Sequence, residues 1–281
     1  MKKLLFFFLI LALFVQDLSA ENPWEHMLWR VRADGSIGWV PGTNDYLKGF
    51  NESERRIASS WSAAAGIDFS FNPVSDYGRM YRGLYQGLGT SIAGFTPGGL
   101  LGTPVGIYVY QGAPVLSFGK GWSIDYEWQF GAACGWRVAG NDVYFNNAVS
   151  TSVTAHMAVG FKIAYSVSPR WQLSAGIRGT HYSNGNTHWP NRGVNTVGAS
   201  VGVSYLLSGR TSAAEAESTL PTVADDCRWM FDIVAYGAWR KRGLVLNDNP
   251  VLVPGKFMIA GLQFAPLRRF SHWFAAGPAL D

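Results

Sequence analysis

Hydrophobic and polar residues alternate along four long segments in the middle of the chain. Between positions 122 and 131 the even positions are apolar or aromatic and the odd positions are polar or small, and the same period of two recurs at 153–166, 171–178 and 196–207. Such alternation is typical of β-strands with one apolar and one polar face. Weaker segments of the same kind lie at 36–40, 57–71, 83–95, 104–118, 228–239 and 256–264. The pattern predicts an all-β protein with roughly 8 to 12 antiparallel strands.

The residue types on the two faces indicate which face would be enclosed. The polar face combines small residues with potential ion-pair partners, namely Asp125, Glu127, Lys162 and Arg178, whereas the apolar face has bulky aromatic residues near the strand ends. Apolar residues outside and polar residues inside are the signature of a transmembrane β-barrel. We therefore expect an outer-membrane β-barrel, with a soluble secreted β protein as the alternative.

The N-terminus has the features of an export sequence. Lys2 and Lys3 precede an apolar run from position 4 to 15, and small residues follow at Ser19 and Ala20. This pattern predicts a signal peptide at 1–20 and a single barrel domain at 21–281. The closing stretch SHWFAAGPALD begins like a strand and lacks a terminal aromatic residue. We expect either a short last strand or an incomplete C-terminus.

Composition supports a surface that faces lipid. Charged residues make up 15% of the chain, against about 25% in an average soluble domain, while aromatic residues also reach 15%. The net charge of +4 is spread along the chain, which argues against nucleic acid as a partner. Cys134 and Cys227 lie far apart and nothing in the sequence requires them to pair. The histidines show no metal-ligand spacing, so we expect no metal and no other cofactor.

The stretch HYSNGNTHWPNRGVN at 181–195 contains the candidate chemistry. Extending the lipid-facing side of the strand that starts at Trp171 reaches His181 and Ser183, and counting back along the next strand reaches Asn195. If the hairpin is symmetric about His188, His181 lies opposite Asn195 and Ser183 opposite Gly193. Cross-strand neighbours lie about 5 Å apart, so hydroxyl, imidazole and carboxamide would converge on the lipid side.

The depth of this group in a membrane follows from strand length. Ten residues separate Trp171 from His181, which is about 33 Å along a strand and about 23 Å across the membrane at a tilt near 45°. The two residues would then lie at opposite interfaces. The short turn at 166–169 would be periplasmic, which places His181 and Ser183 at the outer leaflet, although the long loop after position 207 would then be periplasmic too, against the usual rule.

These residue types suit serine esterase chemistry. A serine hydroxyl needs a base to remove its proton, and histidine is suited to that role at neutral pH. Asn195 could accept the Nδ1 proton and orient the ring, but a neutral amide cannot offset the imidazolium charge. Asn184 could donate a hydrogen bond to a developing oxyanion. The alternative is a polar hairpin tip, because the SNGN segment is also favourable turn sequence.

The same stretch resembles the lipid A 3-O-deacylase (PagL-type) family of outer-membrane barrels, whose members have a His-x-Ser-Asn motif at a strand end, a Pro-Asn-x-Gly turn and an acidic residue. Here the motif reads His181, Tyr182, Ser183, Asn184, then Pro190, Asn191 and Gly193. The resemblance implies that His181 is the base, Ser183 the nucleophile and Asn184 the oxyanion helper. The acidic position of the family falls on Asn195, which departs from the pattern.

By this resemblance the chain is expected to be a carboxylic ester hydrolase similar to a lipid A deacylase or an acyloxyacyl hydrolase. Its substrate would be lipid A or lipopolysaccharide, among the lipids of the bacterial outer membrane. Two alternatives remain. One is a non-enzymatic porin- or adhesin-like barrel, in which Ser183 would be dispensable. The other is an esterase for phospholipid, which would use the same site and give a different product.

Overall fold

The computed structural model describes residues 27–72, 78, 81, 83–138, 146–207, 228–246, 249–270 and 275–281. The predicted signal peptide, the long loop expected after position 207 and Cys227 lie outside these residues. In the described part of the chain, no helix is both long and apolar enough to cross a membrane.

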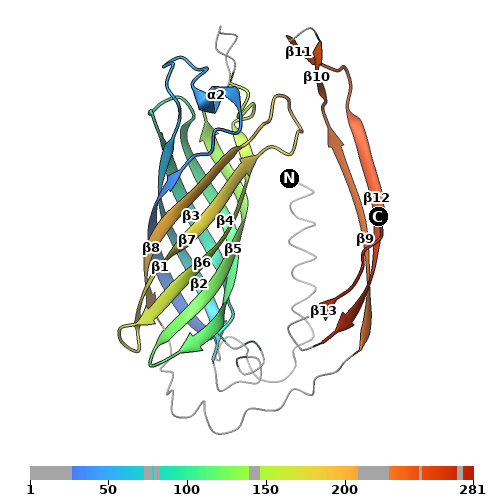
Figure 1. Cartoon of the computed structure of the whole chain (residues 1–281). Helices are drawn as coiled ribbons and strands as arrows, with labels where there is room; N and C mark the ends of the chain where they lie inside the picture. The colour runs from blue at the N-terminus through green and yellow to red at the C-terminus, as the bar shows by residue number, and fades with distance from the viewer. Residues whose placement is uncertain are drawn as a thin grey trace, which may run out of the picture.

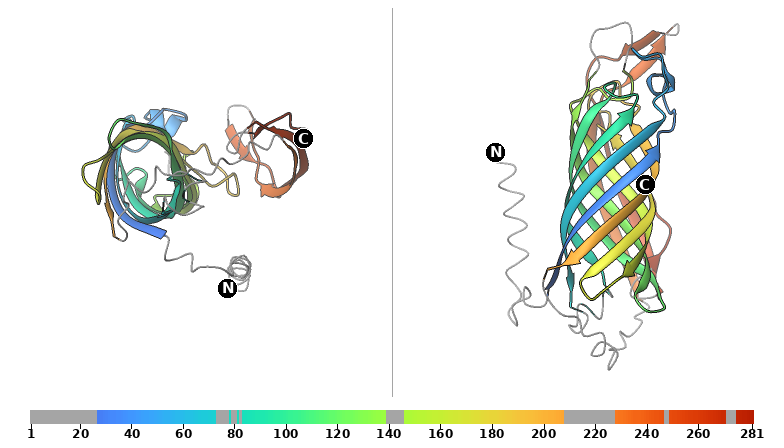
Figure 2. Two further views of the ribbon diagram at one scale, coloured as in Figure 1. Left: turned by 90° about the horizontal axis from the view of Figure 1, so that it is seen from below. Right: turned by 90° about the vertical axis from the view of Figure 1, so that its left-hand side faces the viewer.

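Eight antiparallel strands form a closed barrel, seen from the side in Figure 1 and along its axis in Figure 2. Each strand pairs with the next along the chain, and the last pairs with the first. The prediction of an all-β transmembrane barrel is confirmed. The strands are β1 (Met27–Trp39), β2 (Ser59–Phe71), β3 (Tyr85–Thr96), β4 (Gly102–Phe118), β5 (Trp122–Trp136), β6 (Val153–Ser166), β7 (Trp171–Ser183) and β8 (Val194–Leu206).

The first strand is longer than its sequence pattern indicated. We predicted a strand only at 36–40, whereas β1 begins at Met27 and pairs along its length with β2. Its inward positions are occupied by Arg30, Arg32 and Asp34, and charged residues are unfavourable signals for a strand. These side chains are accommodated because the barrel interior supplies partners of opposite charge. The start of β1 was therefore hidden by the residues that the lumen requires.

The exposure of side chains shows which face of the wall is apolar. Outward residues around the barrel are large, apolar and exposed, as at Ile37 (73%), Ile107 (66%) and Val201 (66%). Inward residues include buried acids and amides, such as Asp68 (1%) and Glu127 (9%). This is the sense of alternation expected in a bilayer, where lipid covers the outer face.

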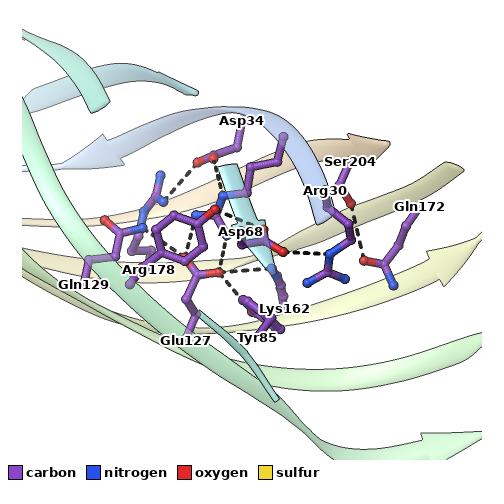
Figure 3. A network of polar contacts seen from close by, with 12 residues as sticks. Arg30, Asp34, Asp68, Tyr85, Glu127, Gln129, Lys162, Gln172, Arg178 and Ser204 are labelled. Carbon is purple, nitrogen blue, oxygen red and sulfur yellow. Dashed lines mark hydrogen bonds and ion pairs between the residues drawn. The ribbon is translucent and has the colours of Figure 1, made fainter. Parts of the chain in front are cut away.

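Glu127 is the centre of a polar network inside the barrel (Figure 3). Arg32 donates two hydrogen bonds to its carboxylate, at 2.6 and 2.8 Å, and Lys162 lies 3.1 Å from Oε2. Tyr85 and Gln129 each donate a further hydrogen bond of 3.0 Å. Buried charges are stable when paired and hydrogen-bonded in this way, so the lumen holds these strands in register.

Two further ion pairs join strands inside the lumen. Arg30 donates at 2.8 Å to Asp68, its ladder partner on β2, and Arg178 of β7 donates at 3.0 Å to Asp34 of β1. His156 of β6 also faces inward. Its ring stacks on Tyr108, with ring centroids 4.7 Å apart, and the ring is buried. The interior is thus filled with paired polar and aromatic groups.

Aromatic side chains gather at the end of the barrel opposite the β7–β8 loop. Trp122 stacks on Tyr165 with ring centroids 4.4 Å apart, and Trp171 lies 4.7 Å from Tyr205. Such residues are enriched at membrane interfaces. This belt marks one interface, and the strand length places the β7–β8 loop near the other.

An apolar cluster, here called the cap, closes the barrel end that has the β7–β8 loop. It combines residues of the strand ends with residues of the loops and of the short helix α2 (Asp45–Lys48). Tyr46 of α2 is buried, and its single hydroxyl proton is shared between two acceptors, the Glu52 carboxylate and the Leu100 carbonyl. Burial raises the pKa of Tyr46 above its usual value, and Glu52 adds to the shift. The cap members are Val40, Tyr46, Leu47, Ile57, Phe95, Leu100, Leu101, Ala133, Trp136, Ala148, Val149, Tyr182 and Val194.

The remaining strands lie outside the barrel. β9 (Trp229–Arg240), β12 (Phe257–Arg269) and β13 (Ala275–Ala276) form one sheet, and β10 (Gly243–Leu246) pairs with β11 (Asn249–Leu252). The strands predicted at 228–239 and 256–264 therefore exist, but in a separate sheet. The single domain predicted for 21–281 stays a prediction.

Candidate active site

The register of β7 and β8 brings His181 and Asn195 together. The two residues are direct partners in the ladder, as counting through the hairpin predicted. His181 Nδ1 lies 2.7 Å from Asn195 Oδ1. Since an amide oxygen can only accept, Nδ1 bears the proton in this contact. The other ring nitrogen, Nε2, is then the basic one.

Ser183 is the last residue of β7, two positions beyond His181 on the same face. The β7–β8 ladder ends at the pair Tyr182 and Val194, so the expected pairing of Ser183 with Gly193 does not form. Ser183 pairs instead with Ala155 of β6. Its hydroxyl accepts hydrogen bonds from the Gly185 N–H at 3.1 Å and from Asn191 Nδ2 at 2.9 Å. Among the described residues, no hydrogen bond joins this hydroxyl to the imidazole.

Asn184 follows the serine, and its polar groups are already engaged. Its Nδ2 donates to Ser150 Oγ and to the His188 carbonyl, both at 3.0 Å. Its backbone N–H donates to Asn191 Oδ1 at 3.1 Å. In this arrangement the Asn184 side chain holds the loop. Its role toward an oxyanion stays a prediction.

Asn191 is the site residue whose role sequence reasoning missed. Its side chain donates to the Ser183 hydroxyl and accepts from the Asn184 N–H. It belongs to the Pro-Asn-x-Gly turn, so the sequence showed the residue. The eight-residue separation from Ser183 gave no indication that the loop folds back onto the strand end. The amide bonded to Ser183 in the structure is that of Asn191.

Gly193 is the close neighbour of the imidazole on the loop side. Its φ of +72° lies in the left-handed region, and a Cβ at this position would lie 2.9 Å from His181 Cε1. Glycine is required on both counts, by conformation and by space. The ring of His181 is therefore held between Asn195 on one side and the Gly193 backbone on the other.

Two other loops hold the β7–β8 loop in place. Arg192 and Gly193 donate backbone hydrogen bonds of 3.0 Å to the carbonyls of Asn147 and Ala148. Ser150 donates to the His188 carbonyl, and Asn44, before α2, donates to the Gly193 carbonyl at 3.3 Å. These contacts fix the loop against the cap, which is the rigid support that a positioned nucleophile needs.

The histidine and its partner open onto the outer face of the wall. A depression of about 340 Å³ is lined there by His181, Asn195, Met157, Val159, Gly179 and Val197, with Ala158, Thr180 and Thr196. Apart from the imidazole, the amide and the two threonines, this lining is apolar or glycine. The depression therefore exposes the imidazole of His181 on the apolar outer face of the wall.

The remaining candidate groups give no second site. Within the residues that the structure describes, no group of three His, Cys, Asp or Glu side chains is arranged to hold a metal ion. Cys134 is a free, exposed cysteine.

Three solved structures of outer-membrane proteins align with this chain at low identity. Neisserial surface protein A (NspA) aligns with a TM-score of 0.43 and 13% identity, over 63% of this chain and 96% of that one. The outer membrane enzyme PagL aligns with a TM-score of 0.41 and 12% identity, over 61% and 97%. The outer membrane protein AlkL gives 0.33 and 15%, over 70% and 95%. No curated protein matches the chain in sequence.

A family profile also matches part of the chain. The family is described as lipid A 3-O-deacylase (PagL), and the match covers residues 98–204. That range includes His181, Ser183, Asn184, Asn191 and Asn195. The resemblance to the lipid A 3-O-deacylase (PagL) family that the His-x-Ser-Asn motif indicated is therefore confirmed over residues 98–204.

Proposed function

We propose that this protein is an outer-membrane serine esterase that hydrolyses an ester-linked acyl chain of lipid A, in the manner of a 3-O-deacylase. The observation that supports it most directly is the 2.7 Å contact between His181 and Asn195 on the lipid-facing wall, with Ser183 two residues away on the same face. A base that is oriented by a third group, next to a hydroxyl, is the arrangement that activates a nucleophile.

The reaction would proceed in two steps. Ser183 Oγ attacks the ester carbonyl while His181 Nε2 takes the hydroxyl proton, which requires a ring or serine rotamer that brings the two atoms into contact. The tetrahedral intermediate collapses when the bond from the acyl carbon to the sugar oxygen breaks and His181 gives its proton to that oxygen, so the sugar leaves with a free hydroxyl and an acyl-serine remains. A water molecule, deprotonated by the same nitrogen, then hydrolyses the acyl-serine and restores the hydroxyl.

The developing oxyanion needs donors close to Ser183. The Asn191 amide and the Gly185 N–H already point at the Ser183 hydroxyl. When the hydroxyl becomes an ester oxygen, these donors are adjacent to the carbonyl that it has attacked. Asn184 could join them by exchanging its hydrogen bond with Ser150 for one with the oxyanion.

The position of the site in the wall favours a lipid substrate in the outer leaflet. The aromatic belt lies at the opposite end of the strands, so His181 is at the second interface, where ester groups of membrane lipids lie. The chains of such a lipid stay among other acyl chains while the ester reaches the barrel rim. No exit of substrate from the membrane is needed.

A porin-like function is disfavoured by the cap. Thirteen buried apolar residues fill the barrel end at the site, and the interior below it is occupied by the Glu127 network. A water-filled channel requires a wider barrel than eight strands provide. A phospholipid esterase would use the same residues, so the product must decide between the two substrates.

Mass spectrometry of lipids from cells that express the protein tests this function. With wild type we expect lipid A that has lost one acyl chain and unchanged phospholipids. With Ser183→Ala the lipid A should stay intact. The matched control is Ser174→Ala, an inward-facing serine on the same strand, which should behave as wild type. Intact lipid A with a folded wild-type barrel in the membrane would refute the proposal, and loss of phospholipid chains would assign the substrate to the alternative.

A further inference from the structure

A second depression lies on the same outer wall, where β8 passes to β1 and β2. It encloses about 580 Å³, and its apolar walls are formed by Ile37, Trp39, Trp61, Val197 and Ala199. Ser59 and Thr96 line its end nearest the loops. None of the residues that we assign to catalysis contributes to it.

The two depressions adjoin, because Val197 lines both. Val197 is the ladder partner of Gly179 on β7 and of Trp39 on β1. Trp39 in turn pairs with Ser59 on β2. One row of neighbouring residues on β7, β8, β1 and β2 thus leads from the depression at His181 into the second one.

The strand tilt brings the second depression to the height of the histidine. In the barrel the strands tilt by about 45°, so each step to the next strand along a ladder row climbs about 3.4 Å toward the loop end, as the slope of β7 and β8 in Figure 1 indicates. Trp39 is two steps from Gly179, or about 7 Å higher, while His181 is about 5 Å above Gly179 along its own strand. Trp39 and His181 are therefore nearly level.

The walls of the second depression are shaped by close packing. A Cβ at Gly94 of β3 would lie 2.5 Å from the indole of Trp61, so the ring of Trp61 lies against the backbone of β3. Trp39 and Ile37 are the next outward side chains on the other side, and both are more than half exposed. The side chain at the floor on β8 is Ala199, which is small. The large side chains that border the depression are therefore Trp39, Ile37 and Trp61.

We propose that this depression, made by β8, β1 and β2, binds a second acyl chain of the same lipid molecule whose ester lies at Ser183. The inference rests on the proposed function. The depressions are separated by two strand spacings, about 10 Å. Glycerol places its two esters on adjacent carbons, whereas a disaccharide places acyl groups on two sugar rings. The separation therefore selects a multiply acylated saccharide over a two-chain glycerophospholipid.

The second depression, called the second groove from here on, would act by positioning the substrate. Acyl chains of the bilayer are as apolar as the groove, so a chain gains little hydrophobic free energy by entering it. A chain held there fixes the headgroup relative to Ser183, and such fixing raises the rate of the chemical step. The groove should therefore affect only substrates that have a second chain to place in it.

Filling the groove tests the proposal. Ala199→Trp places an indole on its floor without touching the depression at His181. With purified protein in detergent micelles, we expect kcat/KM for a hexa-acylated disaccharide lipid to fall about tenfold, a typical size for a packing change in a binding pocket. The rate with a single-chain p-nitrophenyl acyl ester should stay unchanged. Ser59→Phe, which fills the loop end of the groove, should give the same split.

The control is Ile107→Trp, which adds the same ring to an exposed, lipid-facing position of β4. It should leave both substrates unaffected. An unchanged rate with the hexa-acylated lipid for both groove variants would overturn the proposal that the groove binds a second acyl chain. An equal loss of rate with both substrates would overturn it as well. Failure of the proposed function looks different, because wild type and Ser183→Ala would then be equally inactive on either substrate.

Discussion

Replacing Asn195 with aspartate would test the orienting contact at the atom on which it depends. Aspartate has the shape of asparagine, so one carboxylate oxygen can take the place of Oδ1, 2.7 Å from His181 Nδ1. The ring would keep its orientation and tautomer. The new negative charge would stabilise the imidazolium that forms when Ser183 gives up its proton, an effect that the neutral amide lacks.

The size of the gain follows from the geometry. Opposite charges about 4 Å apart attract by about 4 kcal/mol at an effective dielectric constant of 20. Both side chains are only half-buried at the barrel rim, where water and salt weaken the attraction to about 1–2 kcal/mol. The imidazolium exists only in the transition state and the intermediates. We therefore expect kcat to rise roughly 5- to 30-fold.

Initial rates with a p-nitrophenyl acyl ester in micelles would measure the change in kcat, and heat-modifiable migration on a gel would show that the barrel is folded. Gln172→Glu is the matched control. It makes the same change from amide to carboxylate on β7, at the opposite end of the strand from His181. An Asn195→Asp protein that is folded and no faster than wild type would show that Asn195 does not orient the base. Asn195→Glu, one methylene longer, should gain less.

Three other changes probe the support of the site and the barrel. Gly193→Ala should lower kcat tenfold or more and destabilise the barrel by about 1–3 kcal/mol, because its Cβ would press on His181. Gly98→Ala, in a loop away from the site, adds a Cβ that meets nothing within 4 Å at a residue without a positive φ, and should retain activity. Glu127→Gln leaves Arg32 and Lys162 without their shared carboxylate and should lower the free energy of unfolding in urea by about 3–5 kcal/mol. A decrease of less than about 1 kcal/mol would contradict a stabilising role of the lumen network. Tyr46 has a raised pKa in the fold, so the protonated hydroxyl contributes to the free energy of unfolding below about pH 10, and this contribution is lost as the pH rises further. The free energy of unfolding of Tyr46→Phe should therefore fall less steeply with alkaline pH than that of wild type. Equal slopes for the two proteins would count against a role of the buried hydroxyl.

The sequence predicted the parts of the molecule in which one strand follows another by a short turn. The alternation along β5 to β8 identified the strands and their lipid-facing sides, and simple counting through the hairpin paired His181 with Asn195. Prediction from the sequence failed where the stabilising partners lie far away along the chain. The inward charges of β1 are unfavourable for a strand until Asp68 of β2 and Glu127 of β5 are placed beside them.

The conformation of the β7–β8 loop was the second feature that the sequence could not predict. Asn191 reaches Ser183 because the loop turns back over eight residues, and that fold depends on contacts with the segments at 146–150 and at Asn44. Strand periodicity contains no information on such contacts. The separate sheet of β9 and β12 was also beyond reach, since its strands alternate like those of the barrel. Only closure of β8 on β1 shows that the barrel is complete without them.

The hydrogen bonds that join the β7–β8 loop to its neighbours determine how this chemistry could be transplanted. A designer who grafted positions 181–195 onto another eight-stranded barrel would move His181, Ser183 and the three asparagines of the site. The carbonyls of Asn147 and Ala148 and the hydroxyl of Ser150 would be left behind. The recipient would display the motif on an unsupported hairpin. The smallest portable unit is a set of three loops from separate parts of the chain, moved together with the apolar side chains beneath them.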